Sequence, residues 1–212
     1  MLRSRILIAD DHTLIADLCK RLLQAEFEIV GTVSDGRGMV RVATQLKPDV
    51  IIVDIAMPLL NGLDAGIQVK AALPAVKLIY LTMNNDPELV LEAFNRGAAG
   101  YLLKTCAVSD LVTAVRDVLR GQTYLSPSLK KEVTRLRWEQ KKVVKEEERL
   151  TERQREVLQL LAEGKVMKEV ADVLHMTTRT VGWHKYRIME VLGTKNNADL
   201  VKYAMRNHLI AA

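Results

Sequence analysis

The sequence of 212 residues has little cysteine and no long apolar run. Its only cysteines, Cys19 and Cys106, show no metal-site or disulfide spacing, which favours reduced thiols in a cytoplasm. No apolar stretch approaches the roughly 20 residues that span a bilayer, so no membrane partner is expected. The N-terminus, MLRSRILIADD, meets two acidic residues by position 11 and does not resemble a signal peptide.

The composition is ordinary for a folded protein, with 49% hydrophobic and 27% charged residues, but the charge is unevenly placed. Residues 1–120 carry 13 basic and 14 acidic side chains, a net charge of −1, whereas residues 121–212 carry 18 and 12, a net of +6. A near-neutral first half joined to a basic second half indicates a polyanion partner for the second half.

Up to about residue 120, short apolar runs alternate with segments of helical periodicity. The expected strands are Arg5–Ala9, Glu28–Val33, Val50–Val53, Lys77–Leu81 and Gly100–Leu103. The expected helices are Thr13–Ala25, Arg37–Gln45, Leu63–Ala72, Glu88–Asn95 and Ser109–Leu119. Five strand–helix repeats predict an α/β fold, a flavodoxin-like, doubly wound parallel sheet covered on both faces.

After residue 121 the character of the sequence changes in two steps. From Pro127 to Leu150 a highly charged segment has a thin apolar stripe, formed by Leu129, Val133, Leu136, Val143 and Val144. This pattern fits either a solvated helical linker or a helix that docks on a domain or a partner chain. We therefore expect a domain over residues 1–121, a linker over 122–149 and a second domain over 150–212.

The last 60 residues predict a small all-α domain. Thr151 and Gln154 form a candidate capping box at the start of the first helix, and Gly164 can end that helix. The segments VMKEVADVLH and TTRTVGWHKYRIMEVLG follow, a short helix and a longer one separated by a tight turn. This order is typical of a helix-turn-helix domain.

Acidic residues collect where the expected strands end. Asp54 closes an apolar run in the segment VDIAMP, a place where a lone aspartate usually only caps the next turn. However, Asp10 and Asp11 follow the first strand, and Thr82 and Lys104 follow the fourth and fifth. Because the carboxyl ends of parallel strands share one edge, we expect all five side chains to converge there.

Three neighbouring carboxylates need positive charge to remain ionised. Lys104 supplies part of it, and a divalent cation can supply the rest; oxygen ligands without a histidine motif favour Mg²⁺ over zinc. A carboxylate beside Mg²⁺ can attack phosphorus, while Lys104 and the Thr82 hydroxyl bind the oxygens of the transferred group. The edge therefore predicts a site at which Asp54 accepts a phosphoryl group.

The segments ILIADD, IIVDIAMP, IYLT and GYLLK resemble the signature segments of the receiver domain of bacterial response regulators. The tail LTERQREVLQLLAEG…KEVADVLHMTTRTVGWHKYRIMEVLG resembles the LuxR-type helix-turn-helix. In this order the two sets resemble the NarL/FixJ class of two-component response regulators, from about residue 4 to residue 210.

The resemblance implies roles for individual residues of the receiver domain. Asp54 would be the phosphoacceptor, and Asp11, Asp54 and the backbone carbonyl of Ala56 would bind Mg²⁺, with Asp10 acting indirectly. Thr82 and Tyr101 would form the switch pair, and Pro58 would shape the loop after the acceptor. The phosphoryl donor would be a sensor histidine kinase, and the phosphorylated chain would bind double-stranded DNA as a homodimer.

The expected recognition helix has two faces. Val181, His184, Lys185, Ile188 and Leu192 fall at helical spacing and should face inward. The outward residues and those near the helix N-terminus are expected to contact bases and phosphates. This DNA-binding set consists of Thr178, Arg179, Thr180, Gly182, Trp183, Lys185, Tyr186 and Arg187.

The chain departs from the family pattern at three places in this domain. Gly182 stands where Lys is more usual, Val166-Met167 where a polar cap is usual, and His175 where Gly is common. Trp183 and Tyr186 are also large for a recognition face; they could contact thymine methyl groups or cover a neighbouring domain.

Two other functional classes can be compared with a phosphorylation-switched transcription regulator. In the first, the C-terminal helices of a signalling adaptor bind protein, for which Gly182, Trp183 and Tyr186 would be suited. The second is a Mg²⁺-dependent phosphohydrolase, but position 56, where a general acid would be needed, is Ala. We therefore expect a phosphoacceptor that is not a turnover enzyme.

Overall fold

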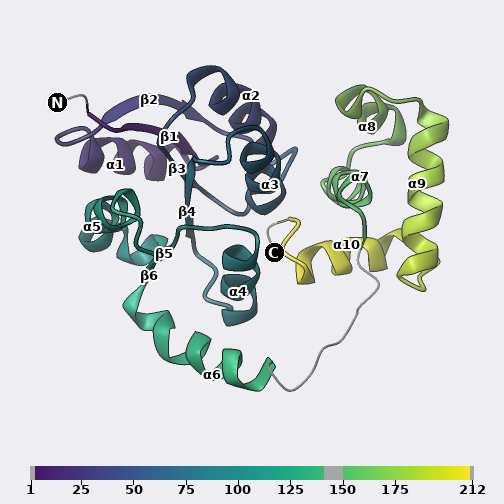
Figure 1. The fold of residues 1–212 in the computed structure, drawn as a ribbon. Coiled ribbons are helices and arrows are strands. Elements are labelled where there is room, and N and C mark those ends of the chain that lie inside the picture. Colours follow the sequence, from purple (N-terminus) through teal and green to yellow (C-terminus); the bar gives the residue numbers. More distant parts are fainter. Residues whose placement is uncertain (1–2, 141–149, 211–212) are drawn as a thin grey trace. The chain divides into compact units, whose positions relative to one another are not determined.

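The computed structural model describes residues 3–140 and 150–210, which form two compact units. The first unit contains a sheet flanked by helices, and the second contains the helices α7 to α10 (Figure 1). In the described ranges, no helix has both the length and the apolar character needed to cross a membrane.

The sheet of the first unit is entirely parallel, with the strand order β2-β1-β3-β4-β5-β6. Its strands are β1 (Arg5–Ala9), β2 (Glu28–Val33), β3 (Val50–Val53), β4 (Lys77–Thr82), β5 (Gly100–Leu103) and β6 (Tyr124–Leu125). The doubly wound parallel sheet expected from the sequence is thus confirmed. The expected five strands are present, with β4 one residue longer, but the short edge strand β6 was missed.

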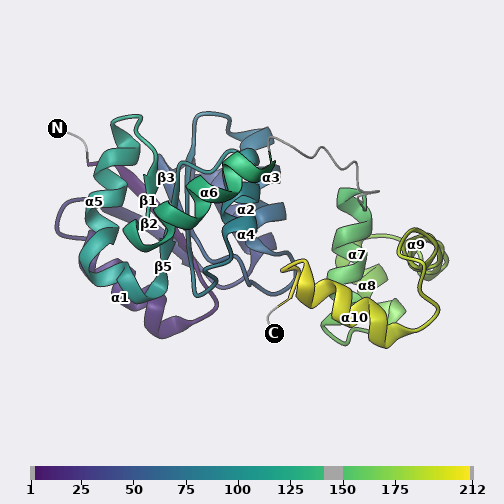
Figure 2. The same cartoon turned by 90° about the horizontal axis from the view of Figure 1, so that it is seen from below.

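Helices cover both faces of this sheet (Figure 2). They are α1 (Thr13–Leu23), α2 (Gly36–Leu46), α3 (Gly62–Ala72), α4 (Pro87–Asn95) and α5 (Ala107–Leu119). Helices α1 and α5 pack together on one face, and α2 and α3 pack together on the other. The expected ends differ by up to two residues, since α1 stops at Leu23 and α5 begins directly after the 3₁₀ turn η1 (Lys104–Cys106).

The alternation of side chains along the strands builds one core on each face. Ile6 and Ile8 of β1 join the cluster under α1 and α5, whereas the side chains of Leu7 and Ala9 point to the opposite face. Every residue of β3 is buried, as expected for a central strand covered on both sides. Burial on both faces explains why these strands read as continuous apolar runs.

Tyr80 is a fully buried phenol on β4 for which Gly66 of α3 leaves room. A Cβ atom at residue 66 would lie 2.2 Å from the Tyr80 hydroxyl oxygen and 3.0 Å from Leu78 Cδ1. The Tyr80 hydroxyl is 3.5 Å from the carbonyl oxygen of Gly62, and burial strongly raises the pKa of this phenol. Helix α3 therefore approaches β4 closely because residue 66 has no side chain.

Gly66→Ala should destabilise the first unit by about 2 kcal/mol, because the added methyl overlaps the phenol oxygen. Tyr80→Phe removes that oxygen, so the double variant should regain most of the loss. Urea denaturation of both single variants and the double variant gives the coupling free energy. If the double variant lost the sum of the two single-variant losses, residues 66 and 80 would not interact.

The segment after β6 is helical and packs on the first unit. It comprises the 3₁₀ turn η2 (Pro127–Leu129) and α6 (Lys130–Gln140), and α6 contacts α4. Leu129 and Val133 are buried and Leu136 is half-buried, so the apolar stripe is a packing surface up to that point. This favours docking over a fully solvated linker, while Val143 and Val144 lie outside the described residues. The domain boundaries at 121 and 149 stay predictions.

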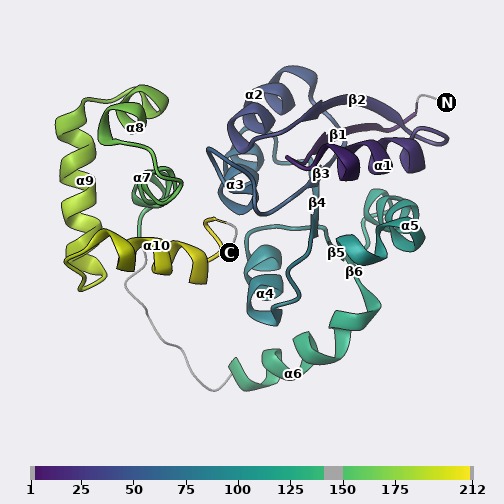
Figure 3. The ribbon, with the colours of Figure 1, turned by 180° about the vertical axis from the view of Figure 1, so that it is seen from behind.

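The second unit consists of α7 (Glu152–Ala162), α8 (Met167–Leu174), α9 (Thr178–Val191) and α10 (Asn197–Arg206) (Figure 3). The predicted capping box is present: Gln154 N–H donates to Thr151 Oγ1 at 3.3 Å, and Thr151 N–H donates to Gln154 Oε1 at 2.8 Å. Helices α8 and α9 are joined through His175, whose φ of +52° explains why glycine suits this position. Val157, Val181 and Ile188 lie in the core.

Candidate functional site

The carboxyl edge of the sheet brings the predicted acidic residues together. Asp10 follows β1 and Asp54 follows β3, two adjacent strands in register, and the Asp54 N–H donates to the carbonyl of Ala9 at 2.8 Å. Both carboxylates are buried, with exposed fractions of 4% and 3%. Two charged groups at the ends of apolar strands are therefore held side by side and away from solvent.

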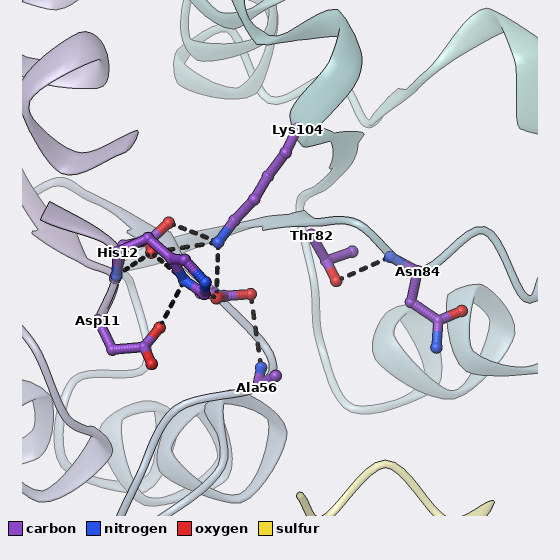
Figure 4. Close-up of polar contacts among 8 residues, drawn as sticks. Asp11, His12, Ala56, Thr82, Asn84 and Lys104 are labelled. Atoms are coloured by element: carbon purple, nitrogen blue, oxygen red, sulfur yellow. Dashed lines mark hydrogen bonds and ion pairs between the residues drawn. The ribbon is translucent and has the colours of Figure 1, made fainter. Parts of the chain in front are cut away.

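Lys104 reaches this pair from the turn after β5 (Figure 4). Its Nζ lies 2.7 Å from Asp54 Oδ2 and 2.9 Å from Asp10 Oδ2. Burial acts to lower the pKa of Lys104, but the hydrogen bond and the charge of Asp54 outweigh it and raise the pKa. The ammonium group thus stays charged, and one cation faces two buried carboxylates.

Asp11 and His12 complete the cluster from the start of α1 (Figure 4). Ligand atoms of Asp10, Asp11, His12 and Asp54 all lie within 4.8 Å of one another. His12 Nδ1 is 2.8 Å from Asp11 Oδ1 and 3.8 Å from Asp54 Oδ2. His12 directly follows Asp11 in the chain, but the cluster expected from the sequence contained no histidine.

The donors at this edge fit a hard divalent cation. Three carboxylates converge on one ammonium group, and burial raises the pKa of Asp54, although the hydrogen bond and the charge of Lys104 oppose this shift. Oxygen ligands of this kind are those that Mg²⁺ prefers. The Ala56 N–H donates to Asp54 Oδ1 at 3.4 Å, so the backbone of residue 56 lies beside the Asp54 carboxylate.

Lys104→Gln should lower the free energy of unfolding by about 3 kcal/mol at neutral pH, because it leaves two buried carboxylates without their cation. Added Mg²⁺ should restore more stability to this variant than to the wild type. Urea denaturation with and without Mg²⁺ measures both effects, with Lys20→Gln on the exposed side of α1 as the control. Unchanged stability of Lys104→Gln would contradict the inferred charge balance.

Thr82 and Tyr101 lie on the neighbouring strands β4 and β5 and meet at Asn84. The Thr82 hydroxyl oxygen accepts a hydrogen bond from the Asn84 N–H at 3.1 Å. The Tyr101 hydroxyl donates to the Asn84 carbonyl at 2.9 Å, and its ring is completely buried. The predicted switch pair is therefore joined through one residue of the loop before α4, a link that the sequence did not reveal.

The loop after Asp54 leaves no space at Gly62, the first residue of α3. A Cβ atom there would lie 2.1 Å from the carbonyl oxygen of Asp54 and 2.9 Å from Val53 Cγ1. The Gly62 N–H donates to the carbonyl of Ile55 at 2.8 Å, and Pro58 accepts from the Leu60 N–H in the same loop. Asp54, the predicted acceptor, and the start of α3 thus approach each other through their backbones.

In the second unit, α9 has the two faces that its periodicity predicts. Val181 and Ile188 are fully buried, while Arg179, Trp183, Tyr186 and Arg187 are exposed. His184, Lys185 and Leu192 from the expected inward set are only half-buried, and so is Gly182 from the outward set. Arg187 forms an ion pair with Glu190, which compensates part of its charge.

The N-terminal turn of α9 is capped by Thr177, which was not among the residues expected from the sequence. Thr177 Oγ1 accepts the Thr180 N–H at 3.1 Å and lies 2.8 Å from the Thr180 hydroxyl oxygen. Thr178 and Arg179, both exposed, occupy the first turn of the helix. At the start of α8, Val166 offers no polar cap, and its N–H donates to Glu169 instead.

Comparisons with known proteins match both units. Residues 6–116 match the family described as the response regulator receiver domain, and residues 148–204 match the bacterial regulatory proteins of the luxR family. Over 208 residues the chain is 33% identical to the response regulator protein VraR of Staphylococcus aureus (strain Mu3), covering 97% of this chain and 98% of that protein.

Solved structures give the same result. The RcsB response regulator of Salmonella typhimurium matches with 27% identity and a TM-score of 0.64, covering 96% of this chain and 97% of that one. A structure of an RcsB–DNA complex matches with 27% identity and a TM-score of 0.56, covering 95% of this chain and 97% of that one.

Proposed function

This chain belongs to the response regulators that join a receiver domain to a luxR-family DNA-binding domain, and from that premise we propose that phosphorylation of Asp54 switches its binding to specific DNA sequences. Such proteins act in two-component signalling and transcription regulation. One observation supports the proposal above others: Asp54, Asp10 and Lys104 converge in the same chain as a helix-turn-helix.

In the proposed chemistry, each group at the carboxyl edge of the sheet has a role. The Asp54 carboxylate attacks the phosphorus atom of a phosphoryl donor, and the leaving group departs on the opposite side. The Lys104 Nζ lies 2.7 Å from Asp54 Oδ2, and its charge neutralises oxygens of the transferred group. Asp11, Asp54 and the carbonyl of Ala56 would hold Mg²⁺, with Asp10 acting indirectly, and the ion would supply positive charge to the same oxygens.

The switch is proposed to run through Thr82 and Tyr101. A phosphoryl oxygen on Asp54 offers the Thr82 hydroxyl a stronger acceptor than any neutral group. Recruitment of that hydroxyl would alter the hydrogen bonds at Asn84, to which the Tyr101 hydroxyl also donates. The receiver would thereby shift between two conformations, and the shift would control pairing of the chains and exposure of their DNA-binding units.

The proposed partners follow from the same sites. A sensor histidine kinase would supply the phosphoryl group, and small acyl phosphates could replace it. Double-stranded DNA would bind along α9, consistent with the RcsB–DNA complex among the similar structures and with the net charge of +6 in residues 121–212. Two chains would bind paired half-sites as a homodimer, and binding to chromosomal DNA would place the protein in the cytoplasm.

We propose that Asp54 accepts a phosphoryl group and later loses it, and that the chain is not a turnover enzyme. A hydrolase using Asp54 as nucleophile needs a general acid beside the leaving group, and the nearby position 56 is Ala. The family is regulatory, which agrees with a site that retains its phosphoryl group.

Selection of binders from random duplex DNA, with and without acetyl phosphate and Mg²⁺, tests the function. We expect an enriched sequence whose affinity rises on phosphorylation and falls about a hundredfold or more between about 50 and 200 mM salt. Arg179→Ala should weaken binding to all duplexes. The absence of any preferred sequence under both conditions would refute the proposal, and salt-independent capture of another protein would favour an adaptor.

A further inference from the structure

The outer side of the helix-turn-helix carries apolar side chains where solvent-facing residues are usually polar. Val166, Met167, Trp183 and Tyr186 expose 62%, 40%, 58% and 66% of their surface. Two are large aromatic residues on one helix, and the other two precede or begin α8. An exposed group of this kind usually marks a binding surface.

Three of these residues lie near Gly182. A Cβ atom at residue 182 would lie 3.9 Å from Met167 Sδ, so the start of α8 lies directly beside α9 at this point. Tyr186 follows Gly182 by one helical turn, and Trp183 is its neighbour in the chain. We call Met167, Trp183 and Tyr186 the α9 apolar surface; Gly182, which has no side chain, lies next to Met167, and both aromatic residues follow it on the same side of the helix.

The indole ring of Trp183 contacts the imidazole ring of its neighbour in the chain. The rings of Trp183 and His184 meet edge to face, with centroids 4.9 Å apart and planes at 73°. His184 is itself half-buried, since α9 packs on α7 and α8 along this side. A side chain that already contacts a neighbouring ring has less conformational freedom to lose when a ligand covers it.

The charges around the α9 apolar surface indicate what covers it. Lys168 and Arg179 are exposed beside it, and Lys185 is half-exposed on the same helix. Basic side chains around an apolar centre complement a polyanion that also presents apolar groups. In the major groove of duplex DNA, the only such groups are the C5 methyl groups of thymine.

The α9 apolar surface also lacks the side chains that read other bases. Guanine is usually read by Arg or Lys forks and adenine by Asn or Gln. Positions 182, 183 and 186 supply none of these, and Arg187 is engaged with Glu190. Gly182 adds no polar side chain to this part of the helix, so Met167, Trp183 and Tyr186 are the side chains available to a base edge there.

From these contacts we infer that Trp183 and Tyr186, together with Met167, read thymine methyl groups, so that the chain prefers thymine at adjacent positions facing Gly182. This inference rests on the proposed binding of DNA by α9. It names thymine as the base that this chain selects and assigns the selection to apolar residues in place of basic ones.

Replacing thymine by deoxyuridine, one position at a time, in the selected duplex isolates the methyl group. Wild-type protein should lose about fourfold in affinity at each of two or more neighbouring positions, the effect of one buried CH₂. Trp183→Ala and Tyr186→Ala should bind thymine and deoxyuridine duplexes equally well at those positions. Met205→Ala, which removes an exposed apolar side chain of α10, should discriminate as the wild type does.

The possible outcomes separate this inference from the proposed function. A selected duplex that binds equally well with deoxyuridine at every position would overturn the reading of methyl groups and leave DNA binding intact. Unchanged discrimination in both aromatic variants, with folding verified by circular dichroism, would also overturn it. Failure to select any duplex would contradict the proposed function itself, and this inference with it.

Discussion

Asp54→Asn will abolish the gain of one phosphoryl mass that the wild-type chain shows after incubation with acetyl phosphate and Mg²⁺. The amide that replaces the carboxylate is not a nucleophile toward phosphorus, and Asp10, the other buried carboxylate beside Lys104, is expected to act only indirectly. Asp54 Oδ2 lies 2.7 Å from Lys104 Nζ, and Asp54 is only 3% exposed. Intact-mass spectrometry measures the result directly.

The matched control is Asp17→Asn, which changes an exposed carboxylate on α1 by the same atoms. This variant should gain mass at the wild-type rate. Asp54→Asn should also keep its size-exclusion profile and DNA affinity unchanged when acetyl phosphate is added, whereas the wild type should change in both. A phosphoryl adduct that persists in Asp54→Asn would assign the acceptor to another residue.

Gly62→Ala will destabilise the first unit by 3 kcal/mol or more and slow phosphorylation. The added Cβ atom would lie 2.1 Å from the Asp54 carbonyl oxygen, and backbone cannot move aside as the end of a flexible side chain can. Overpacking by one methyl group usually costs about 1–3 kcal/mol, and a clash with backbone belongs at or beyond the upper end. Relief of the clash must displace either α3 or the acceptor residue.

Urea denaturation and the rate of mass gain with acetyl phosphate together measure this effect. Gly182→Ala is the control for stability: the nearest atom to its Cβ would be 3.9 Å away, and Ala favours the helix over Gly by about 1 kcal/mol. It should therefore be as stable as the wild type or slightly more so. If Gly62→Ala matched the wild type in both measurements, the loop would be far more adaptable than its contacts indicate.

The sequence predicts the sheet well because the strands carry their own signal. A central strand such as Val50–Val53 is apolar at every position, since both of its faces are covered. The edge strand Tyr124–Leu125 has only two residues, so no periodicity can reveal it, and it exists only through pairing with β5. Helix α5 begins earlier than expected because a 3₁₀ turn leads directly into it from Lys104.

The sequence predicts the site residues that directly follow strands, but it predicts the local contacts of the site less well. Asp54 and Lys104 could be brought together from parallel topology alone, although 50 positions separate them. His12 was overlooked because metal-binding histidines were sought by spacing, whereas this one adjoins an aspartate. The surroundings of Gly182 depend on Met167 of another helix, a contact that periodicity within α9 cannot report.

Asn84 has a consequence for how sharply the receiver can respond. Its N–H and its carbonyl hold the hydroxyl groups of Thr82 and Tyr101 respectively, so a displacement of this one residue disturbs both bonds at once. Partial rearrangement, with one hydroxyl bonded and the other released, leaves a buried phenol without its acceptor and is correspondingly rare. For the proposed switch we therefore expect both bonds to change together, so that the transition is all-or-none rather than graded.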